Sequence, residues 1–129
     1  RIRPSSSGAR VQLATALVRQ KRNQEALATI EEAIRSDPQS GQAHFIHGII
    51  LEGMSRGEEA ISAYEQAVKL DPKNLEARNN LGIAYARAGR NEEAVTAFEE
   101  TLRIDPNFKK ARQNLQRAKA GPGHAANGS

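Results

Sequence analysis

A 34-residue period runs through the chain and constrains its fold more than any other feature of the sequence. The dipeptide Asp-Pro recurs at this spacing, beginning at Asp37, Asp71 and Asp105. Gly48 and Gly82 share another register of the same period. Several registers that coincide at one spacing indicate an array of structural repeats, in which each unit packs on its neighbours.

Each repeat is predicted to contain two helices. In the third repeat, residues 75–88 and 92–104 carry apolar side chains at helical spacing. Gly89 lies between them, where a helix can end with positive φ, and Asn91 is a candidate N-cap for the second helix. Pro106 then stops that helix, because proline has no N–H to continue the hydrogen-bond ladder. Short connections of this kind make the two helices antiparallel.

These positions resemble the tetratricopeptide repeat family. The residues of the third repeat that fall at family positions are Leu81, Gly82, Tyr85, Ala94, Phe98 and Pro106. The early Trp position of the family instead holds Arg10, His44 and Arg78, and the following Leu position holds His47 in the second repeat. The resemblance implies an all-α fold, a right-handed α-solenoid of three helix-turn-helix repeats followed by a C-terminal solvating helix.

Domain boundaries follow from the same register. We predict a repeat domain over residues 7–120, divided into repeats 7–40, 41–74 and 75–108 and a closing helix 109–120. The closing helix should bury Ala111, Leu115 and Ala118 and turn its basic side chains to water. Residues 1–6 and 121–129 are small, polar and rich in Gly, Pro and Ser, and are expected to be a linker and a disordered tail.

The candidate binding surface is the inner, concave face of the array, which the first helix of each repeat lines in this family. An apolar patch with polar groups at its edge is a candidate interface. The predicted partner-binding residues are Phe45, Ile46, Ile49, Asn79, Asn80, Ile83, Arg87, Lys110, Asn114 and Arg117. The alternative is ordinary packing for the apolar residues of this set, and plain solvent exposure for the amides and cations.

Asn80 has the most specific expected role. In its Asn-Leu-Gly context it resembles peptide-binding members of the family, in which the amide pairs with the donor and acceptor of an extended peptide backbone. Some members grip a C-terminal carboxylate through Lys and Asn on successive inner helices. Here Val11 and Thr15 occupy two of those positions, so we do not expect that clamp.

The sequence offers no catalytic or metal-binding constellation, so we predict no enzymatic activity, no cofactor and no metal site. It has no Cys, no Gly-rich phosphate loop and no nucleophile beside a base. His44 and His47 are three residues apart on one predicted helix, but a third ligand is lacking. Partly buried packing is the better interpretation of both, with some sensitivity to pH near neutrality.

Charge and hydropathy narrow the class of partner. Net charge is +3 over residues 1–40, −4 over 41–108 and +5 over 109–129, so no continuous basic stripe for nucleic acid is predicted. No apolar run approaches the roughly 20 residues of a transmembrane helix. The sequence does not determine the compartment; a cytoplasmic location is favoured, and periplasmic or membrane-tethered ones stay open.

We therefore predict a protein–protein interaction scaffold. Its partner would be a peptide or protein segment, apolar or amphipathic, with an acidic flank that meets Lys110 and Arg117. The alternative is a structural module whose apolar inner face drives oligomerisation or accepts a neighbouring chain.

Overall fold

The computed structural model describes residues 6–121, which fall into two compact units, the first ending at Asp71 and the second beginning at Pro72. The first unit contains α1 (Ser7–Arg19), α2 (Asn23–Ser36), α3 (Gly41–Gly53) and α4 (Gly57–Leu70). The second contains α5 (Leu75–Arg87), α6 (Asn91–Ile104) and α7 (Lys109–Ala120). The predicted terminal tails lie outside the described residues, except for Ser6 and Gly121.

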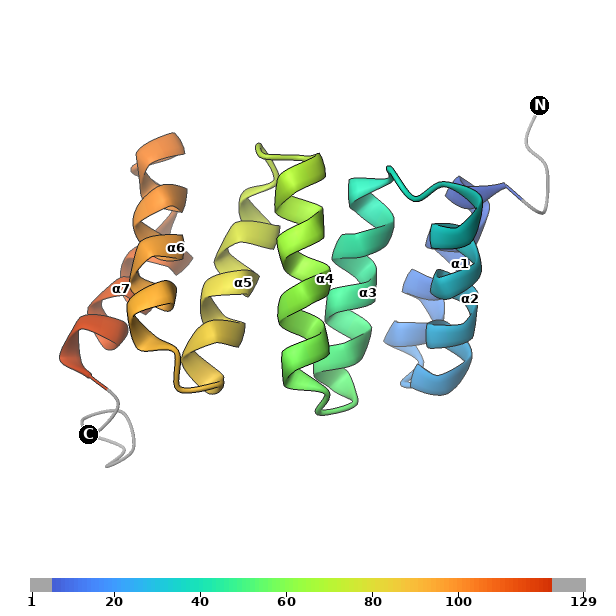
Figure 1. The fold of residues 1–129 in the computed structure, drawn as a ribbon, viewed down its shortest axis with the longest axis horizontal. Coiled ribbons are helices and arrows are strands. Elements are labelled where there is room, and N and C mark those ends of the chain that lie inside the picture. Colours follow the sequence, from blue (N-terminus) through green and yellow to red (C-terminus); the bar gives the residue numbers. More distant parts are fainter. Residues whose placement is uncertain (1–5, 122–129) are drawn as a thin grey trace. The chain divides into compact units, whose positions relative to one another are not determined.

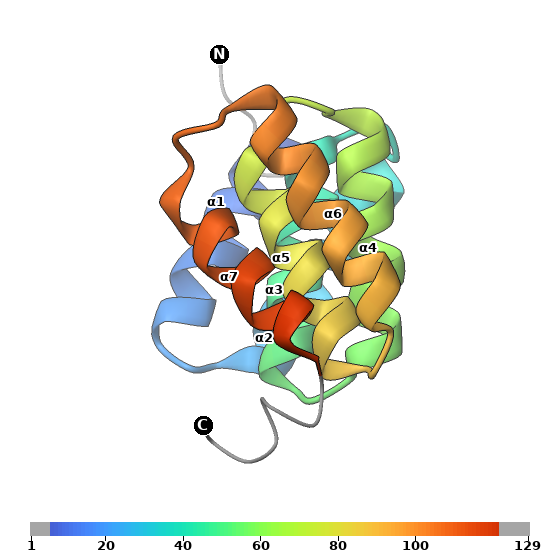
Figure 2. The ribbon, with the colours of Figure 1, turned by 90° about the vertical axis from the view of Figure 1, so that its left-hand side faces the viewer.

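Within each unit, consecutive helices pack side by side. In the first unit α1 packs on α2 and α3, and α3 packs on α4 (Figure 1). In the second unit α7 lies against both α5 and α6 (Figure 2). Residues 6–121 contain helices, turns and no strand, so the all-α prediction is confirmed for this part of the chain. None of these helices has the length and apolar character that crossing a membrane requires.

The first helix of each repeat begins at a polar cap. The side chains of Ser6, Ser40 and Asn74 accept a hydrogen bond from the backbone N–H three residues later, at the starts of α1, α3 and α5. Each cap satisfies one of the N–H groups that a helix start leaves without an intrahelical acceptor. The 34-residue spacing of the caps therefore sets the spacing of these helices.

The second helix of each repeat begins differently, and here the prediction for Asn91 is wrong. Asn91 is the first residue of α6, its N-cap is Arg90, and no side chain caps the helix. The Asn91 side chain turns away and donates from Nδ2 to the carbonyl of Ala118 on α7, at 2.7 Å. A side-chain amide one residue inside the helix reaches a neighbouring helix instead of its own N-terminus.

Arginine–glutamate pairs recur at these second-helix starts, one in each repeat. Arg22 bonds Glu25, Arg56 bonds Glu59, and Arg90 bonds Glu93, each through two guanidinium nitrogens and both carboxylate oxygens. The hydrogen bond from the arginine lowers the pKa of each of these glutamate carboxyls. Negative charge in the first turn also suits the positive end of the helix dipole.

The turn between paired helices uses one residue with positive φ. Gly89 has φ of 81°, as predicted, but Lys21 and Ser55 take the same place in the first two repeats, with φ of 62° and 60°. The glycine of the second repeat, Gly57, is instead the first residue of α4. The turn conformation is thus kept where the sequence supplies no glycine.

The paired helices approach most closely at the small residues that the sequence singles out. A Cβ added to Gly48 would lie 2.5 Å from Cε1 of Tyr64, and one added to Gly82 would lie 2.4 Å from Cε1 of Phe98. Both rings are fully buried. Glycine at these two positions therefore makes room for an aromatic ring from the partner helix.

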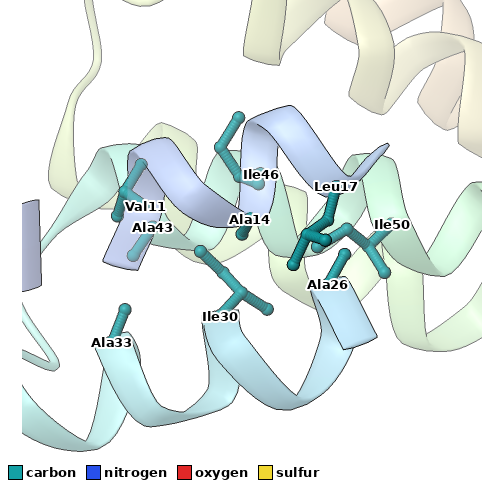
Figure 3. Close-up of a cluster of buried hydrophobic side chains, with 9 residues drawn as sticks. All are labelled: Val11, Ala14, Leu17, Ala26, Ile30, Ala33, Ala43, Ile46 and Ile50. Atoms are coloured by element: carbon teal, nitrogen blue, oxygen red, sulfur yellow. The ribbon is translucent and has the colours of Figure 1, made fainter. Parts of the chain in front are cut away.

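The core of the first unit is a cluster of buried aliphatic side chains from α1, α2 and α3, shown in Figure 3. Its members are Val11, Ala14, Leu17, Ala26, Ile30, Ala33, Ala43, Ile46 and Ile50.

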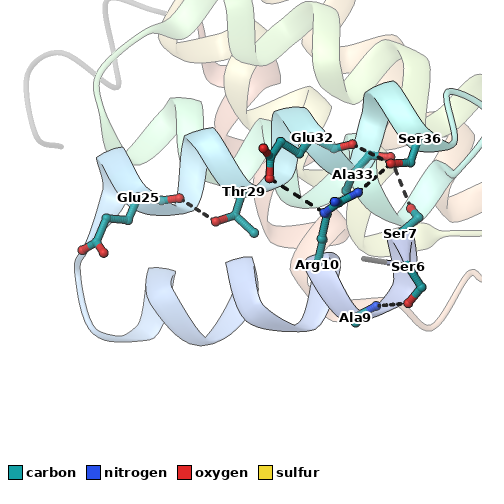
Figure 4. Close-up of polar contacts among 9 residues, drawn as sticks. All are labelled: Ser6, Ser7, Ala9, Arg10, Glu25, Thr29, Glu32, Ala33 and Ser36. Atoms are coloured by element: carbon teal, nitrogen blue, oxygen red, sulfur yellow. Dashed lines mark hydrogen bonds and ion pairs between the residues drawn. The ribbon is translucent and has the colours of Figure 1, made fainter. Parts of the chain in front are cut away.

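Helices α1 and α2 also share polar contacts at one end (Figure 4): Arg10 donates to Ser36 Oγ at 2.7 Å, and Ser7 Oγ donates to the carbonyl of Ala33 at 3.3 Å.

Polar contacts also explain why the early Trp position of the family can be polar here. His44 Nε2 lies 3.0 Å from the carbonyl of Pro38, and Arg78 Nε donates to the carbonyl of Pro72 at 2.8 Å. In both repeats the side chain fastens the start of the helix to the Asp-Pro turn six residues before it. A polar side chain at this position is thus satisfied by a backbone carbonyl of the preceding turn.

Candidate ligand-binding hollow in the second unit

Four of the predicted partner-binding residues line one hollow of about 330 Å³ within the second unit. We call it the C-terminal hollow. Its lining residues are Ile83, Ala86, Arg87, Asn91, Phe98, Asn114, Arg117, Ala118 and Gly121. They come from α5, α6, α7 and the residue after α7, so all three helices of the unit shape it.

The hollow combines an apolar surface with polar groups. Phe98 is fully buried, Ala118 is buried and Ile83 is half-buried, which gives an aliphatic and aromatic surface within the unit. Arg87 and Arg117 are exposed and bring two positive charges. Apolar walls with a few placed polar groups are typical of ligand sites.

Asn79 and Asn114 bind each other. Nδ2 of Asn114 donates to Oδ1 of Asn79 at 3.2 Å, joining α5 to α7. Asn79 is only 2% exposed, so the structure contradicts its prediction as a residue that contacts the partner directly. Its side chain faces the closing helix, α7, rather than open solvent. Asn114 is half-buried and stays on the lining of the hollow.

Asn80 differs from its neighbour Asn79. It is half-buried, and within residues 6–121 its side-chain amide makes no hydrogen bond. The amide therefore keeps two donors and an acceptor for another molecule. Its predicted pairing with a peptide backbone stays a prediction.

The predicted cations have different surroundings. Lys110 Nζ lies 3.5 Å from both carboxylate oxygens of Glu76, in an exposed pair that salt screens. Arg117 makes no ion pair or hydrogen bond with any residue in the described part of the chain. Of these two side chains, Arg117 is the one placed at the hollow.

The apolar residues predicted on the first unit are largely covered by that unit. Ile46 is 6% exposed and belongs to the core cluster with Val11 and Leu17, so its prediction as a partner contact is contradicted. Helix α3 thus packs on α1 through Ile46. Phe45 and Ile49 are half-buried against the same cluster. The Phe45 ring also lies 6.3 Å from that of Tyr64, at a tilt of 47°.

Two further hollows repeat one position in successive repeats, and sequence reasoning did not find them. In the second unit a hollow of about 360 Å³ is lined by Leu81, Tyr85, Glu92, Glu93, Thr96, Ala97 and Glu100. In the first unit one of about 330 Å³ is lined by Ile34, His44, His47, Leu51, Glu59, Ser62, Ala63 and Gln66. Most of these residues are related by the 34-residue period, which is the signal that could have found them.

His47 and Glu59 both line the hollow of the first unit, and each has a lowered pKa. Burial lowers the pKa of His47 below its ordinary 6.5, and the neighbouring His44 and Arg56 lower it further, while Glu31 and Glu59 act the other way. Within residues 6–121, no three His, Cys, Asp or Glu side chains come together in a way that could hold a metal ion.

Comparison with known proteins agrees with the repeated helix pairs seen in the structure. A family model described as tetratricopeptide repeat matches residues 11–53 and 47–107. No sequence among the curated proteins matches the chain. Solved structures match it over most of its length.

Three of these structures show the range of the likeness. A crystal structure of MamA superposes with a TM-score of 0.87 at 25% identity, over 93% of this chain and 70% of that one. The first tetratricopeptide domain of Spaghetti (RPAP3), bound to the HSP90 peptide SRMEEVD, gives 0.86 at 18% identity, over 92% and 94%. YrrB, described as having an unusual peptide-binding site, gives 0.79 at 23% identity, over 86% and 57%.

Proposed function

Because the chain belongs to the tetratricopeptide repeat family, whose members serve as protein-interaction scaffolds, we propose that it binds a peptide or protein segment through the C-terminal hollow. The observation that carries this proposal is the meeting of Ile83, Asn114 and Arg117 on one hollow beside the buried ring of Phe98. These three were predicted from sequence as partner contacts, and they come from two helices.

The chemistry of the lining suggests the ligand. An aliphatic side chain would contact Ile83 and Ala86, and an acidic residue beside it would meet the guanidinium of Arg117. This agrees with a segment that is apolar or amphipathic with an acidic flank. For one short segment we expect a Kd on the order of micromolar, about −8 kcal/mol, because a disordered ligand loses entropy when it binds.

Related folds support a peptide as ligand. The RPAP3 domain is bound to a peptide in its structure, and YrrB has a peptide-binding site. Both are under 25% identical to this chain, so they support the class of ligand and no particular sequence. In the first unit, half-buried Phe45 and Ile49 stay proposed as further apolar contacts.

The test is to select peptides from a random library on the purified chain and measure their binding by isothermal titration calorimetry. Ile83→Asp places a charge on the apolar lining and should weaken binding at least about tenfold, or 1.4 kcal/mol. Arg117→Glu should weaken peptides with an acidic residue and leave neutral ones less affected. Circular dichroism of each variant checks that helicity is retained.

A matched control is available on the same unit. Ile104 is 49% exposed at the end of α6 and does not line the C-terminal hollow. Ile104→Asp introduces the same charge and should leave peptide affinity unchanged. Equal affinity of wild type and Ile83→Asp would remove the hollow as the site.

Self-association is the second candidate, and one observation favours it. Leu13 on α1 is 53% exposed, whereas Leu81, two repeats later, is buried. A second chain could cover it. Analytical ultracentrifugation over a wide concentration range tests this: a monomer at the highest concentration refutes assembly, and an oligomer that Leu13→Glu dissolves supports it.

A further inference from the structure

The contact between Asn79 and Asn114 is polar at a place where the chain elsewhere uses apolar side chains. Two repeats earlier, the same two positions are occupied by Val11 and Ile46. Both are 6% exposed and belong to one buried aliphatic cluster of the first unit. In the first unit, α1 and α3 therefore pack together at these positions through aliphatic side chains, without an amide.

An amide at such a place costs stability unless its polar atoms are satisfied. Asn79 is 2% exposed, and its Oδ1 accepts from Nδ2 of Asn114 at 3.2 Å. Because valine fills the same position in the first repeat, packing alone does not require asparagine at 79. What the amide pair adds is a fixed orientation for the side chain of Asn114, which lines the C-terminal hollow.

We propose that Asn79 is a positioning residue for ligand binding: it holds Nδ2 of Asn114, so that Oδ1 of Asn114 accepts a hydrogen bond from a backbone N–H of the bound peptide. This inference rests on the proposed function and adds the chemistry of one contact. It assigns Asn79, although buried, a role in specificity.

The lining of the hollow carries few side-chain acceptors. Arg87 and Arg117 can only donate hydrogen bonds. Asn91 uses Nδ2 on the carbonyl of Ala118, at 2.7 Å, and its Oδ1 is the other side-chain amide acceptor of the lining. A guanidinium group can therefore donate to a ligand carboxylate, whereas a ligand N–H needs an acceptor such as an amide oxygen. The site should therefore disfavour a peptide that has proline or an N-methyl group at this contact.

Three variants separate positioning from packing. Asn79→Asp keeps an acceptor oxygen for Asn114. Asn79→Val removes the acceptor but has the side chain that the first repeat accepts at this position. The double variant Asn79→Val with Asn114→Ile copies the apolar arrangement of Val11 and Ile46, and should melt at or above the temperature of wild type.

The first measurement needs no ligand. In NMR spectra of the ¹⁵N-labelled chain, the side-chain amide of Asn114 should exchange its protons slowly in wild type and Asn79→Asp, and fast in Asn79→Val. The second measurement is calorimetry with a peptide selected on wild type, together with a series of its analogues N-methylated at one backbone nitrogen each.

Asn79→Asp should bind the selected peptide within about threefold of wild type, whereas Asn79→Val and the double variant should bind at least about tenfold more weakly. One N-methyl position should weaken binding to wild type by a similar factor and have little further effect on Asn79→Val. That non-additivity would link the ligand N–H to the amide pair.

Two results would overturn the proposal. Wild-type affinity in Asn79→Val, or a larger loss in Asn79→Asp than in Asn79→Val, would assign Asn79 to packing alone and leave the proposed function standing. Failure of every selected peptide to bind wild type would instead remove the proposed function, and this inference with it.

Discussion

Substituting Gly82 by alanine tests the close approach of α5 and α6 most simply. A Cβ at this position would lie 2.4 Å from Cε1 of Phe98 and 2.8 Å from Cδ1 and Cζ of the same ring. Carbon atoms in contact normally lie about 3.5–4.0 Å apart. The ring is 1% exposed, so most of it is packed against other side chains.

The expected loss of stability combines two opposing terms. Overpacking a well-packed core costs about 1–3 kcal/mol. Alanine gains about 1 kcal/mol over glycine inside a helix. Because the clash involves a rigid aromatic ring that is 1% exposed, we expect the upper part of that cost and a net loss of about 1–2 kcal/mol.

Urea denaturation followed by far-ultraviolet circular dichroism measures this loss. Gly57→Ala is the control, because Gly57 begins α4 and a Cβ there meets no atom within 4 Å. It should leave stability unchanged or raise it by less than about 1 kcal/mol. Combining Gly82→Ala with Phe98→Leu should lose less stability than the sum of the two single variants, because the smaller side chain relieves the clash.

Gly82→Ala as stable as Gly57→Ala would refute the reasoning, since the helix pair would then have room for a methyl group. An additive double variant would show that the ring is not the obstacle.

Three further predictions concern single residues. The folded-state pKa of His47 is depressed below 6.5, so the unfolded chain binds the proton more readily; stability should be complete above about pH 6.5 and fall as the pH drops towards the folded pKa, and urea titrations across pH should show a weaker fall in His47→Leu. Ser55→Gly should raise the melting temperature through a gain of about 1 kcal/mol, because Ser55 has φ of 60°. Asn91→Ala should destabilise the second unit by about 1–2 kcal/mol in urea, because it leaves the carbonyl of Ala118 without the amide donor.

The repeat architecture could be predicted from sequence because its signals are local and recur. Capping residues, Asp-Pro turns and small residues at fixed spacing each fix one helix boundary or one close contact, and the period repeats them. The first helices of the three repeats begin at Ser7, Gly41 and Leu75, and the closing helix begins at Lys109, each 34 residues after the last. Ala111 and Ala118 are buried on the closing helix, as predicted, whereas Leu115 is only half-buried.

The candidate site was harder to predict because it depends on how a helix is rotated about its axis. Ile46 and Asn80 occupy the same register, yet Ile46 is buried in the core while Asn80 is half-buried. The period shows that a residue lies on the inner helix but not whether a neighbouring helix covers it. Asn91 and Phe98 also line the hollow but were not predicted to do so. Both lie on α6, the second helix of its repeat, whereas only the first helix of each repeat was expected to line the binding surface.

The most direct test of the central claim, that the C-terminal hollow binds the ligand, is NMR chemical-shift mapping of the labelled chain with a selected peptide. We expect the largest changes at Ile83, Asn114 and Ala118, saturating at one peptide per chain. Changes centred on His47 and Leu51 in the hollow of the first unit, with none at Ile83 or Asn114, would contradict that claim.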